Sequence, residues 1–353
     1  MNEKKILLAD VKSCNVNGSS PGHYFALAQN YLDMWEALLP VEIMGGPVYQ
    51  GRFSNVFPLP CDELAEANFF KRKLSVMRNC FAALSAAGEN ILVFQSNAIA
   101  TIYICLLFYQ KKRNIFMIQY NQNSIDSAFK RLIYRAVKRK ICGVLCPKQE
   151  IGEAYGLPYF VMPDYCVTPA ILNALETPDI PKKYDYAMVG MIAEDKGVTE
   201  IARLLANTDV SVLIAGRPAT RELRRELEKI CAGCSNIELI LRYTSDEEYD
   251  RFIRSARYCI LNYSDAYSSH SSGVVFDVLY RGVPIVGRSC ESLDFVRDNA
   301  LGYIYQNAAD FDFQSLIRRD ETEYFRHSIV AYLRSQMDVP KALAAFLEEN
   351  RRL

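Results

Sequence analysis

The sequence predicts an α/β protein with two tandem, doubly wound Rossmann-like domains that face a cleft, followed by C-terminal helices. Three observations carry this prediction. Strand-like and helix-like segments alternate twice along the chain, once before and once after a cluster of four prolines. Such alternation is typical of parallel sheets with helices on both faces. The chain also has 353 residues, more than one ordinary hydrophobic core organises.

Residues 1–166 hold the first alternating set and are predicted to form the N-terminal Rossmann-like domain. Short apolar runs predict strands at 6–9, 41–44, 91–94, 115–119, 143–146 and 159–162. Apolar residues at helical spacing predict helices between them, at 25–35, 64–84, 98–109 and 125–140, with a short one after Pro147. A loop rich in Gly, Ser and Asn, residues 15–22, precedes the first helix.

The prolines at positions 163, 169, 178 and 181 predict a linker over residues 167–183. Residues 184–335 then form the second domain, and residues 336–353 a C-terminal helix. Strands are predicted at 186–189, 210–215, 237–241, 258–262, 284–287 and 302–305, with helices at 199–206, 219–231, 247–256 and 274–280. Ser245 and Glu248 have the spacing of a capping box at the start of the third of these helices.

Composition excludes several classes of protein. Half of the residues are hydrophobic and 23% are charged, which argues against general disorder. Basic and acidic residues balance at 41 each, so we expect no nucleic-acid partner. The eleven cysteines are scattered and lie mostly in apolar runs, which indicates reduced thiols. With no signal-like opening and no apolar run of about 18 residues, we expect a cytoplasmic protein, peripheral at the inner face of the membrane.

The balanced charge hides an asymmetry. Residues 1–166 hold 18 basic and 13 acidic residues, a net of +5, and the remainder holds 23 and 28, a net of −5. A helical pattern over 125–140 places six apolar residues on one face, namely Ile125, Phe129, Leu132, Ile133, Ala136 and Val137. The basic residues Lys130, Arg131 and Arg135 then fall on the other face. This helix either docks on an anionic membrane surface or is simply solvated.

Three loops that follow strands of the second half carry the candidate chemistry. The first ends in His270, Ser271, Ser272 and Gly273 at a helix start, where amide groups favour phosphate, although an ordinary turn capped by Ser272 fits equally. Asp277, four residues later, is close enough to reach a ribose. In the second loop Lys196 follows Gly190, and in the third Arg217 follows a strand end. Either cation suits a phosphate, and either could be an exposed loop charge.

These elements, in this order, resemble the nucleotide-sugar domain of GT-B glycosyltransferases, particularly family four. The match rests on Gly190, the pair Lys196-Gly197, and Asp277 followed by Gly282-Val283-Pro284. The resemblance spans about residues 184–305. It implies that Lys196 binds the diphosphate of a donor, that Asp277 holds the ribose, and that amides near Gly273 bind phosphate. No cofactor beyond the nucleotide-sugar substrate is expected.

Three positions depart from the family's pattern. Met191 stands where the family usually has arginine, so one diphosphate contact is either missing or supplied by Arg217. Ser269 stands where the first of two glutamates belongs, and Asp277 replaces the second. Gln119-Tyr120 occupies the place where many members carry an active-site histidine.

Histidine is the natural base for a hydroxyl acceptor near neutral pH, and the chain has three. His23 follows the early loop that contains Gly18 and Gly22, and it is the candidate catalytic base, although a cap or surface histidine also fits. No metal site is expected: Asp310-Phe311-Asp312 lies after the last strand, and Cys231 and Cys234 lack a second ligand pair.

The sequence therefore predicts a metal-independent, hexosyltransferase-type glycosyltransferase. Residues 184–335 would bind the nucleotide-sugar donor, and residues 1–166 the acceptor. The enzyme would transfer sugar from a nucleotide diphosphate to a hydroxyl of a glycan or lipid-linked acceptor, in polysaccharide or glycolipid biosynthesis. Two alternatives stay open. One is a non-catalytic GT-B binding protein, favoured by Met191 and Ser269. The other is a nucleotide-sugar 2-epimerase, which shares the fold but needs more carboxylates and histidines than these loops offer.

Overall fold

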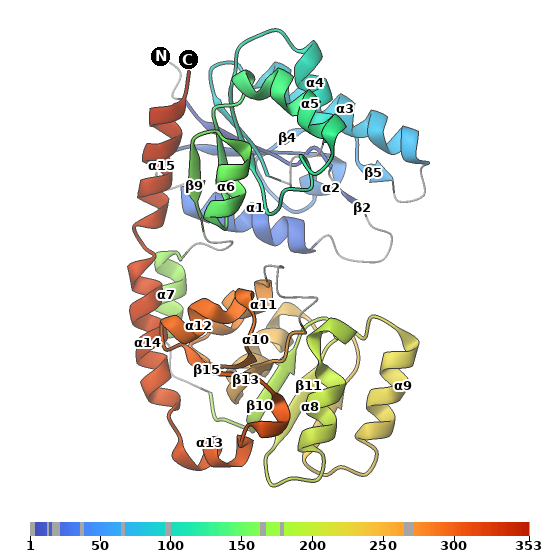
Figure 1. Cartoon of the computed structure of the whole chain (residues 1–353), viewed down its shortest axis with the longest axis vertical. Helices are drawn as coiled ribbons and strands as arrows, with labels where there is room; N and C mark the ends of the chain where they lie inside the picture. Colours follow the sequence, from blue (N-terminus) through green and yellow to red (C-terminus); the bar gives the residue numbers. More distant parts are fainter. Residues whose placement is uncertain are drawn as a thin grey trace. The chain divides into compact units, whose positions relative to one another are not determined.

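The computed structural model describes residues 4–12, 14–15, 22–35, 39–64, 68–95, 100–162, 167–176, 180–264 and 272–352. The chain divides into two compact units, and each is described by itself (Figure 1). Unit 1 comprises residues 1–166 together with 338–353, and unit 2 comprises residues 167–337.

The sheet of unit 1 is parallel throughout, with strand order β4-β3-β1-β6-β7-β8-β9. The strands are β1 (Ile6–Ala9), β3 (Val41–Gly45), β4 (Val56–Pro58), β6 (Ile91–Phe94), β7 (Asn114–Ile118), β8 (Gly143–Cys146) and β9 (Tyr159–Val161). A separate two-stranded sheet pairs β2 (Cys14–Asn15) with β5 (Glu63–Leu64). The side chains of β1 alternate between two cores, Ile6 and Leu8 on one face and Leu7 and Ala9 on the other.

Helices cover both faces of this sheet, which is the doubly wound arrangement. One core is formed with α3 (Phe69–Ala86), α4 (Ala100–Phe108), α5 (Ala128–Val137) and α6 (Gln149–Tyr155). The other is formed with α1 (Gly22–Trp35), α2 (Pro47–Gln50) and the last helix, α15 (Val339–Asn350). A short 3-10 helix, η1 (Lys138–Lys140), continues α5.

Helix α15 belongs to unit 1, although it comes from the far end of the chain. Leu343 and Leu347 are fully buried in the core of that unit. The Phe346 ring lies 6.0 Å from that of Phe116 and 5.7 Å from that of Phe160. A side chain at Gly143 would lie only 3.0 Å from Phe346, so the absence of one at this strand position allows the helix to approach.

Unit 2 has a second parallel sheet, with strand order β12-β11-β10-β13-β14-β15. Its strands are β10 (Tyr184–Val189), β11 (Val212–Ala215), β12 (Ile237–Ile240), β13 (Ala256–Leu261), β14 (Ile285–Arg288) and β15 (Gly302–Tyr305). Its helices are α7 (Pro169–Leu175), α8 (Val198–Leu205), α9 (Arg221–Ile230), α10 (Asp246–Arg254), α11 (Gly273–Leu279), α12 (Asp294–Asp298), α13 (Phe313–Arg319) and α14 (Thr322–Ser335). Among its described residues, three short 3-10 helices are η2 (Glu194–Lys196), η4 (Glu291–Leu293) and η5 (Ala308–Asp310).

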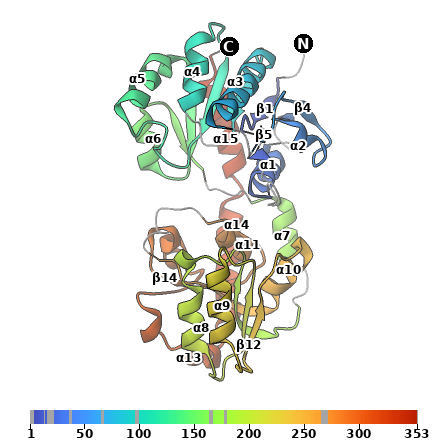
Figure 2. The same ribbon diagram turned by 90° about the vertical axis from the view of Figure 1, so that its right-hand side faces the viewer.

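Helices cover both faces of the second sheet as well. Helices α8 and α9 lie side by side on one face (Figure 2), and α10, α11 and α12 pack on the other. The capping box at the start of α10 is present: the Ser245 hydroxyl accepts from the Glu248 amide, and the Glu248 carboxylate accepts from the Ser245 amide. The predicted fold class, two doubly wound α/β domains in tandem, is confirmed.

Two helix predictions need correction. Phe129 and Leu132 were expected on the buried face of the basic helix, but they are 67% and 66% exposed, and Ala136 is exposed too. The stripe that α5 buries runs through Ile133, Tyr134 and Val137 instead. Leu64, expected in the long helix that became α3, lies in β5. Within the segment expected as a linker, residues 169–175 form α7, which packs against α14.

No helix within the described ranges is both long enough and apolar enough to cross a bilayer. The nine cysteines that the structure describes are all free.

Candidate functional site

The site lies where the chain order of the second sheet reverses. From β10 the chain proceeds outward through β11 and β12, and then returns to place β13 against the other side of β10. In parallel sheets, ligands bind beyond the carboxyl ends of the two strands at such a switch point. Gly190 follows β10 at this point, and Asn262 follows β13.

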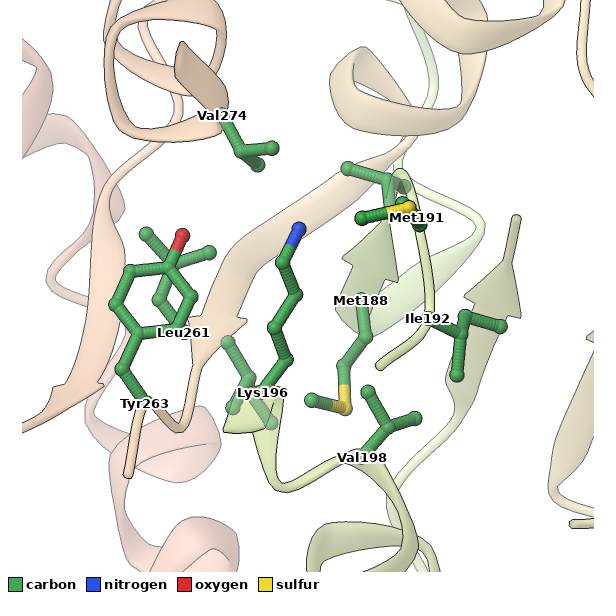
Figure 3. A pocket seen from close by; sticks show the side chains of 10 residues that line it. Met188, Met191, Ile192, Lys196, Val198, Leu261, Tyr263 and Val274 are labelled. Carbon is green, nitrogen blue, oxygen red and sulfur yellow. The ribbon is translucent and has the colours of Figure 1, made fainter. Parts of the chain in front are cut away.

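A pocket opens between these strand ends (Figure 3). It is mostly apolar and is lined by residues of β10, the loop after it, β13 and α11, namely Met188, Val189, Met191, Ile192, Lys196, Val198, Ile260, Leu261, Tyr263 and Val274. The Lys196 side chain rises between Tyr263 and Met188 and directs its amino group toward Val274 and Met191 (Figure 3). The pocket therefore presents one positive charge among apolar walls.

Lys196 has no counter-ion within the described part of the chain, and no acceptor there takes a hydrogen bond from its ammonium. Burial lowers the pKa of Lys196, and the charge of the neighbouring Asp195 only partly opposes this shift. A partly desolvated ammonium without a partner among the described residues is unfavourable, and an anion bound beside it relieves that cost. The geometry therefore suits a phosphate-like group.

The turn that carries Lys196 is held by Asn262, a residue that the sequence analysis did not single out. The Asn262 amide nitrogen donates to the Gly197 carbonyl at 3.2 Å and to the Glu200 carboxylate at 2.9 Å. Its oxygen accepts from the Tyr305 hydroxyl at 2.9 Å. Gly197 has φ +57°, and a Cβ there would lie 2.4 Å from the Asn262 nitrogen. Asn262 thus fixes the turn across 65 residues of sequence.

Two further glycines bring the neighbouring loop into contact with this turn. Gly190 has φ +97°, and a Cβ at Gly216 would lie 1.7 Å from the Gly190 carbonyl oxygen, so only glycine fits. The Ile192 amide donates to the Arg217 carbonyl at 3.0 Å, and the Ala219 amide donates to the Ile192 carbonyl at 2.8 Å. The Arg217 side chain is exposed at this edge and does not line the pocket.

Helix α11 covers the pocket with its first turn. Ser272 precedes it and is buried, but its hydroxyl does not cap the helix. Instead it pairs with the hydroxyl of Tyr263, a wall of the pocket, at 2.5 Å. Gly273 is the first helical residue.

Asp277 lies three residues after Val274, on the same side of α11. Its carboxylate accepts from the Tyr249 hydroxyl at 3.1 Å, and Arg281 binds its carbonyl oxygen at 2.8 Å. Burial raises the pKa of Asp277, while the Arg281 charge and the Tyr249 hydrogen bond oppose the rise. Asp277 therefore lies next to the pocket without lining it. Its carboxylate already has one hydrogen-bond partner, the Tyr249 hydroxyl.

The structure thus gathers Gly190, Lys196, Arg217, Ser272 and Gly273 at one edge of the second sheet, with Asp277 one turn further. Gly18, His270 and Ser271 lie outside the described residues. Gly22 and His23 begin α1, and the His23 side chain is outside what the structure describes. Sequence reasoning missed Asn262 and Tyr263, although a polar residue directly after a buried strand is a usable signal.

The corresponding switch point of unit 1 lies between β1 and β6. Asp10 follows β1 there and is fully buried. Its carboxylate accepts from the Tyr49 hydroxyl at 2.7 Å and from the Lys12 amide at 3.1 Å. Among the described residues no three His, Cys, Asp or Glu side chains are grouped as metal ligands.

No family model matches this sequence, and neither does any curated protein. Solved structures share its fold. An α,α-trehalose-phosphate synthase (UDP-forming) from Burkholderia vietnamiensis has a TM-score of 0.70 at 12% identity, with 98% of this chain and 99% of that chain covered. Sucrose-phosphate synthase from Thermosynechococcus elongatus has 0.67 at 13% identity, with 98% of each covered. Anabaena HepE, solved with UDP and glucose, has 0.65 at 12% identity, covering 98% and 99%. The chain has the GT-B fold of these structures.

Because Gly197 lies so close to Asn262, Gly197→Ala should lower the unfolding free energy more than an alanine at an ordinary turn glycine. Gly88 has the same φ of +57°, but the nearest atom to a Cβ there is 4.0 Å away. Gly88→Ala should cost about 1–2 kcal/mol of unfolding free energy from backbone strain alone. Gly197→Ala should cost about 1–3 kcal/mol more, because the methyl group collides with Asn262. Urea unfolding of both variants measures this difference. Equal losses of unfolding free energy would contradict a close contact between Gly197 and Asn262.

Proposed function

We propose that the protein is a glycosyltransferase that binds a nucleotide-diphosphate sugar at the pocket of unit 2 and transfers the sugar to a hydroxyl acceptor. The observation that carries the proposal is the partly buried ammonium of Lys196 at the switch point of a GT-B fold, which has no ion-pair or hydrogen-bond partner among the described residues. A diphosphate is the anion that this position suits best. The resemblance to family four, strongest at Lys196-Gly197 and at Gly282-Val283-Pro284, supports the same reading.

In the proposed reaction, the bond between the anomeric carbon and the diphosphate oxygen breaks, and a bond to the acceptor oxygen forms. Negative charge grows on the leaving diphosphate, and Lys196 stabilises it, with Arg217 and the amide of Gly273 as further donors. Asp277 holds the ribose. His23 takes the proton of the acceptor hydroxyl. Because two cations serve the leaving group, we propose that transfer needs no metal and continues in EDTA.

The acceptor would be a glycan or a lipid-linked saccharide, bound by unit 1, and the sugar a hexose. We propose a role in polysaccharide or glycolipid biosynthesis on the cytoplasmic side of the membrane. The free thiols of the described cysteines are consistent with a reducing compartment.

The test uses the purified full chain and a panel of nucleotide sugars. Thermal shift identifies the donor, because a bound ligand stabilises the fold by mass action. The identified donor is then incubated with the protein and the products are separated. Release of free sugar, or its transfer, supports the proposal. A donor with an altered sugar would indicate an epimerase, and binding without any turnover would indicate a non-catalytic binding protein.

Lys196→Ala should weaken binding of the donor tenfold to a hundredfold, the loss of a charge-assisted contact of about 1.5–3 kcal/mol. Isothermal titration with the nucleoside diphosphate measures this. Lys229→Ala is the matched control, because Lys229 is exposed on α9 and remote from the lining of the pocket. Equal affinity of the two variants for the nucleoside diphosphate would show that Lys196 does not bind it.

The pKa of Lys196 also predicts the pH dependence of binding. Burial lowers this pKa in the free protein, and a bound diphosphate should raise it again, so binding takes up a proton. Affinity should therefore fall as pH rises, and the fall should begin at a lower pH than the titration of an ordinary lysine, whose pKa is about 10.4. Titrations in buffers of different ionisation enthalpy detect the proton. The Lys196→Ala variant should lose this dependence; a profile that it shares with the unaltered protein would contradict the assignment.

Asp277→Ala should weaken binding of the bare nucleoside diphosphate, because the proposed contact is to the ribose. Tyr249→Phe removes the partner of Asp277 but leaves the carboxylate, and it separates a structural role from a binding role. We expect the first variant to lose affinity about tenfold or more and the second to change little. Similar losses in both would make Asp277 a structural residue of α11.

A further inference from the structure

Five of the large apolar side chains that unit 1 exposes lie on two helices of one layer. Phe69, Phe70 and Leu74 of α3 are 64%, 81% and 49% exposed, and Phe129 and Leu132 of α5 are 67% and 66% exposed. Helix α4 packs against both α3 and α5, so the three form one layer on the sheet (Figure 1). Two further exposed side chains lie apart from these, Phe108 at the other end of α4 and Val161 in β9. Large apolar side chains exposed on both sides of α4 indicate an interaction surface.

These side chains are presented at the same end of the layer. Both helices run antiparallel to the strands of the parallel sheet, so both begin at its carboxyl edge. Phe69 and Phe70 are the first residues of α3, and Phe129 is the second residue of α5. Each helix start is fixed by a side-chain cap: Asn68 accepts from the Lys71 amide at 2.9 Å, and Ser127 accepts from the Lys130 amide at 3.3 Å.

The same segment carries a concentrated positive charge, although the whole chain is neutral. Residues 68–140 hold two acidic residues, Glu89 and Asp126, against 13 basic ones, a net of +11. The basic residues are Lys71, Arg72, Lys73, Arg78, Lys111, Lys112, Arg113, Lys130, Arg131, Arg135, Lys138, Arg139 and Lys140.

Part of this charge serves the fold. Lys140 donates to the Leu106 and Tyr109 carbonyls, Arg113 donates to the Leu84 carbonyl, and Lys130 pairs with Asp126 at 2.9 Å. By contrast, Arg135 on α5 and Lys71 on α3 are exposed beside the apolar side chains. Positive charge therefore borders the apolar surface on both helices.

We propose that this surface, formed by Phe69, Phe70 and Leu74 of α3 and Phe129 and Leu132 of α5, docks unit 1 on an anionic membrane. The apolar side chains enter the boundary between headgroups and acyl chains, and the basic side chains bind the lipid phosphates. Leu74 and Leu132 favour lipid over nucleic acid, because an aliphatic side chain offers no ring to stack on a base. This proposal extends the proposed function, in which the acceptor is linked to a lipid. It rests on that function only for the biological role of membrane binding, since none of these residues belongs to the donor pocket.

Two contributions to membrane binding, electrostatic attraction and insertion of apolar side chains, can be separated by varying the salt concentration. Attraction of the basic residues to anionic lipid is screened as ionic strength rises, with a Debye length of about 10 Å at 0.1 M and about 3 Å at 1 M. Insertion of the apolar side chains is not screened. Binding should therefore weaken in high salt but stay measurable, whereas a purely electrostatic helix face would release completely.

The experiment is flotation of the full chain with phosphatidylcholine vesicles, with and without phosphatidylglycerol, at low and high salt. We expect recovery with the anionic vesicles and at least a tenfold loss of affinity in Phe129→Ser/Leu132→Ser and in Phe69→Ser/Phe70→Ser. Arg131→Glu/Arg135→Glu should lose binding at low salt. Tyr324→Ser is the matched control, because Tyr324 is 62% exposed but belongs to unit 2.

Circular dichroism and nucleotide titration are the controls for folding and for the donor site. Each surface variant should stay folded and bind the donor normally. Lys196→Ala should bind vesicles normally, so a failure of the donor site is distinguishable from a failure of this surface. Equal recovery with neutral and anionic vesicles, or unchanged binding in both serine variants, would overturn the proposal. Two other results would also overturn the proposal. One is a dimer, seen by sedimentation, that Phe129→Ser/Leu132→Ser dissociates while the unaltered protein binds no vesicles. The other is binding of single-stranded DNA without binding of vesicles.

Discussion

The contact between Gly197 and Asn262 sets the position of the groups that line the pocket of unit 2. Gly197 turns the chain with a positive φ, and the amide of Asn262 occupies the space where any other residue would carry a side chain. The same amide binds Glu200 in the first turn of α8, and its oxygen is bound by Tyr305 of the edge strand β15. One buried side chain thus joins the two halves of the sheet on either side of the switch point. Lys196, immediately before this turn, takes its direction from it.

These hydrogen bonds restrain the groups that line the pocket. Burying an ammonium that has no partner among the described residues destabilises the folded chain, and the neighbouring hydrogen bonds offset that cost. The pairing of Ser272 with Tyr263 has a similar effect on the opposite wall, where it holds the start of α11 against the end of β13. A site that is fixed in advance loses little conformational entropy on binding.

The layers of the fold could be predicted from the sequence because strand runs and helix periodicity are local signals. Lys196 and Gly190 were predictable for the same reason, since strand ends and glycines are visible in the chain. Asn262 was not, because its partners lie 65 and 62 residues earlier and 43 later, and nothing local shows that they meet. The error at Phe129 and Leu132 has another cause: periodicity offers two adjacent stripes on α5, and packing against α4 selects the one through Ile133 and Val137. The proposed roles of Lys196, Asp277, Arg217 and His23 all stay predictions. So do those of Gly18, His270 and Ser271, which lie outside the described residues.

Helix α15 has a consequence for how the chain folds as it is made. Unit 1 needs Leu343 and Leu347 for one of its two cores, and these residues are synthesised after the whole of unit 2. Its sheet therefore leaves the ribosome with one face partly uncovered, while unit 2 can complete its own core first. Domains usually fold in the order in which they emerge. Here the order is inverted: the first unit to be translated is the last to be finished, and a chain stalled before residue 339 would expose an unfinished apolar face to chaperones.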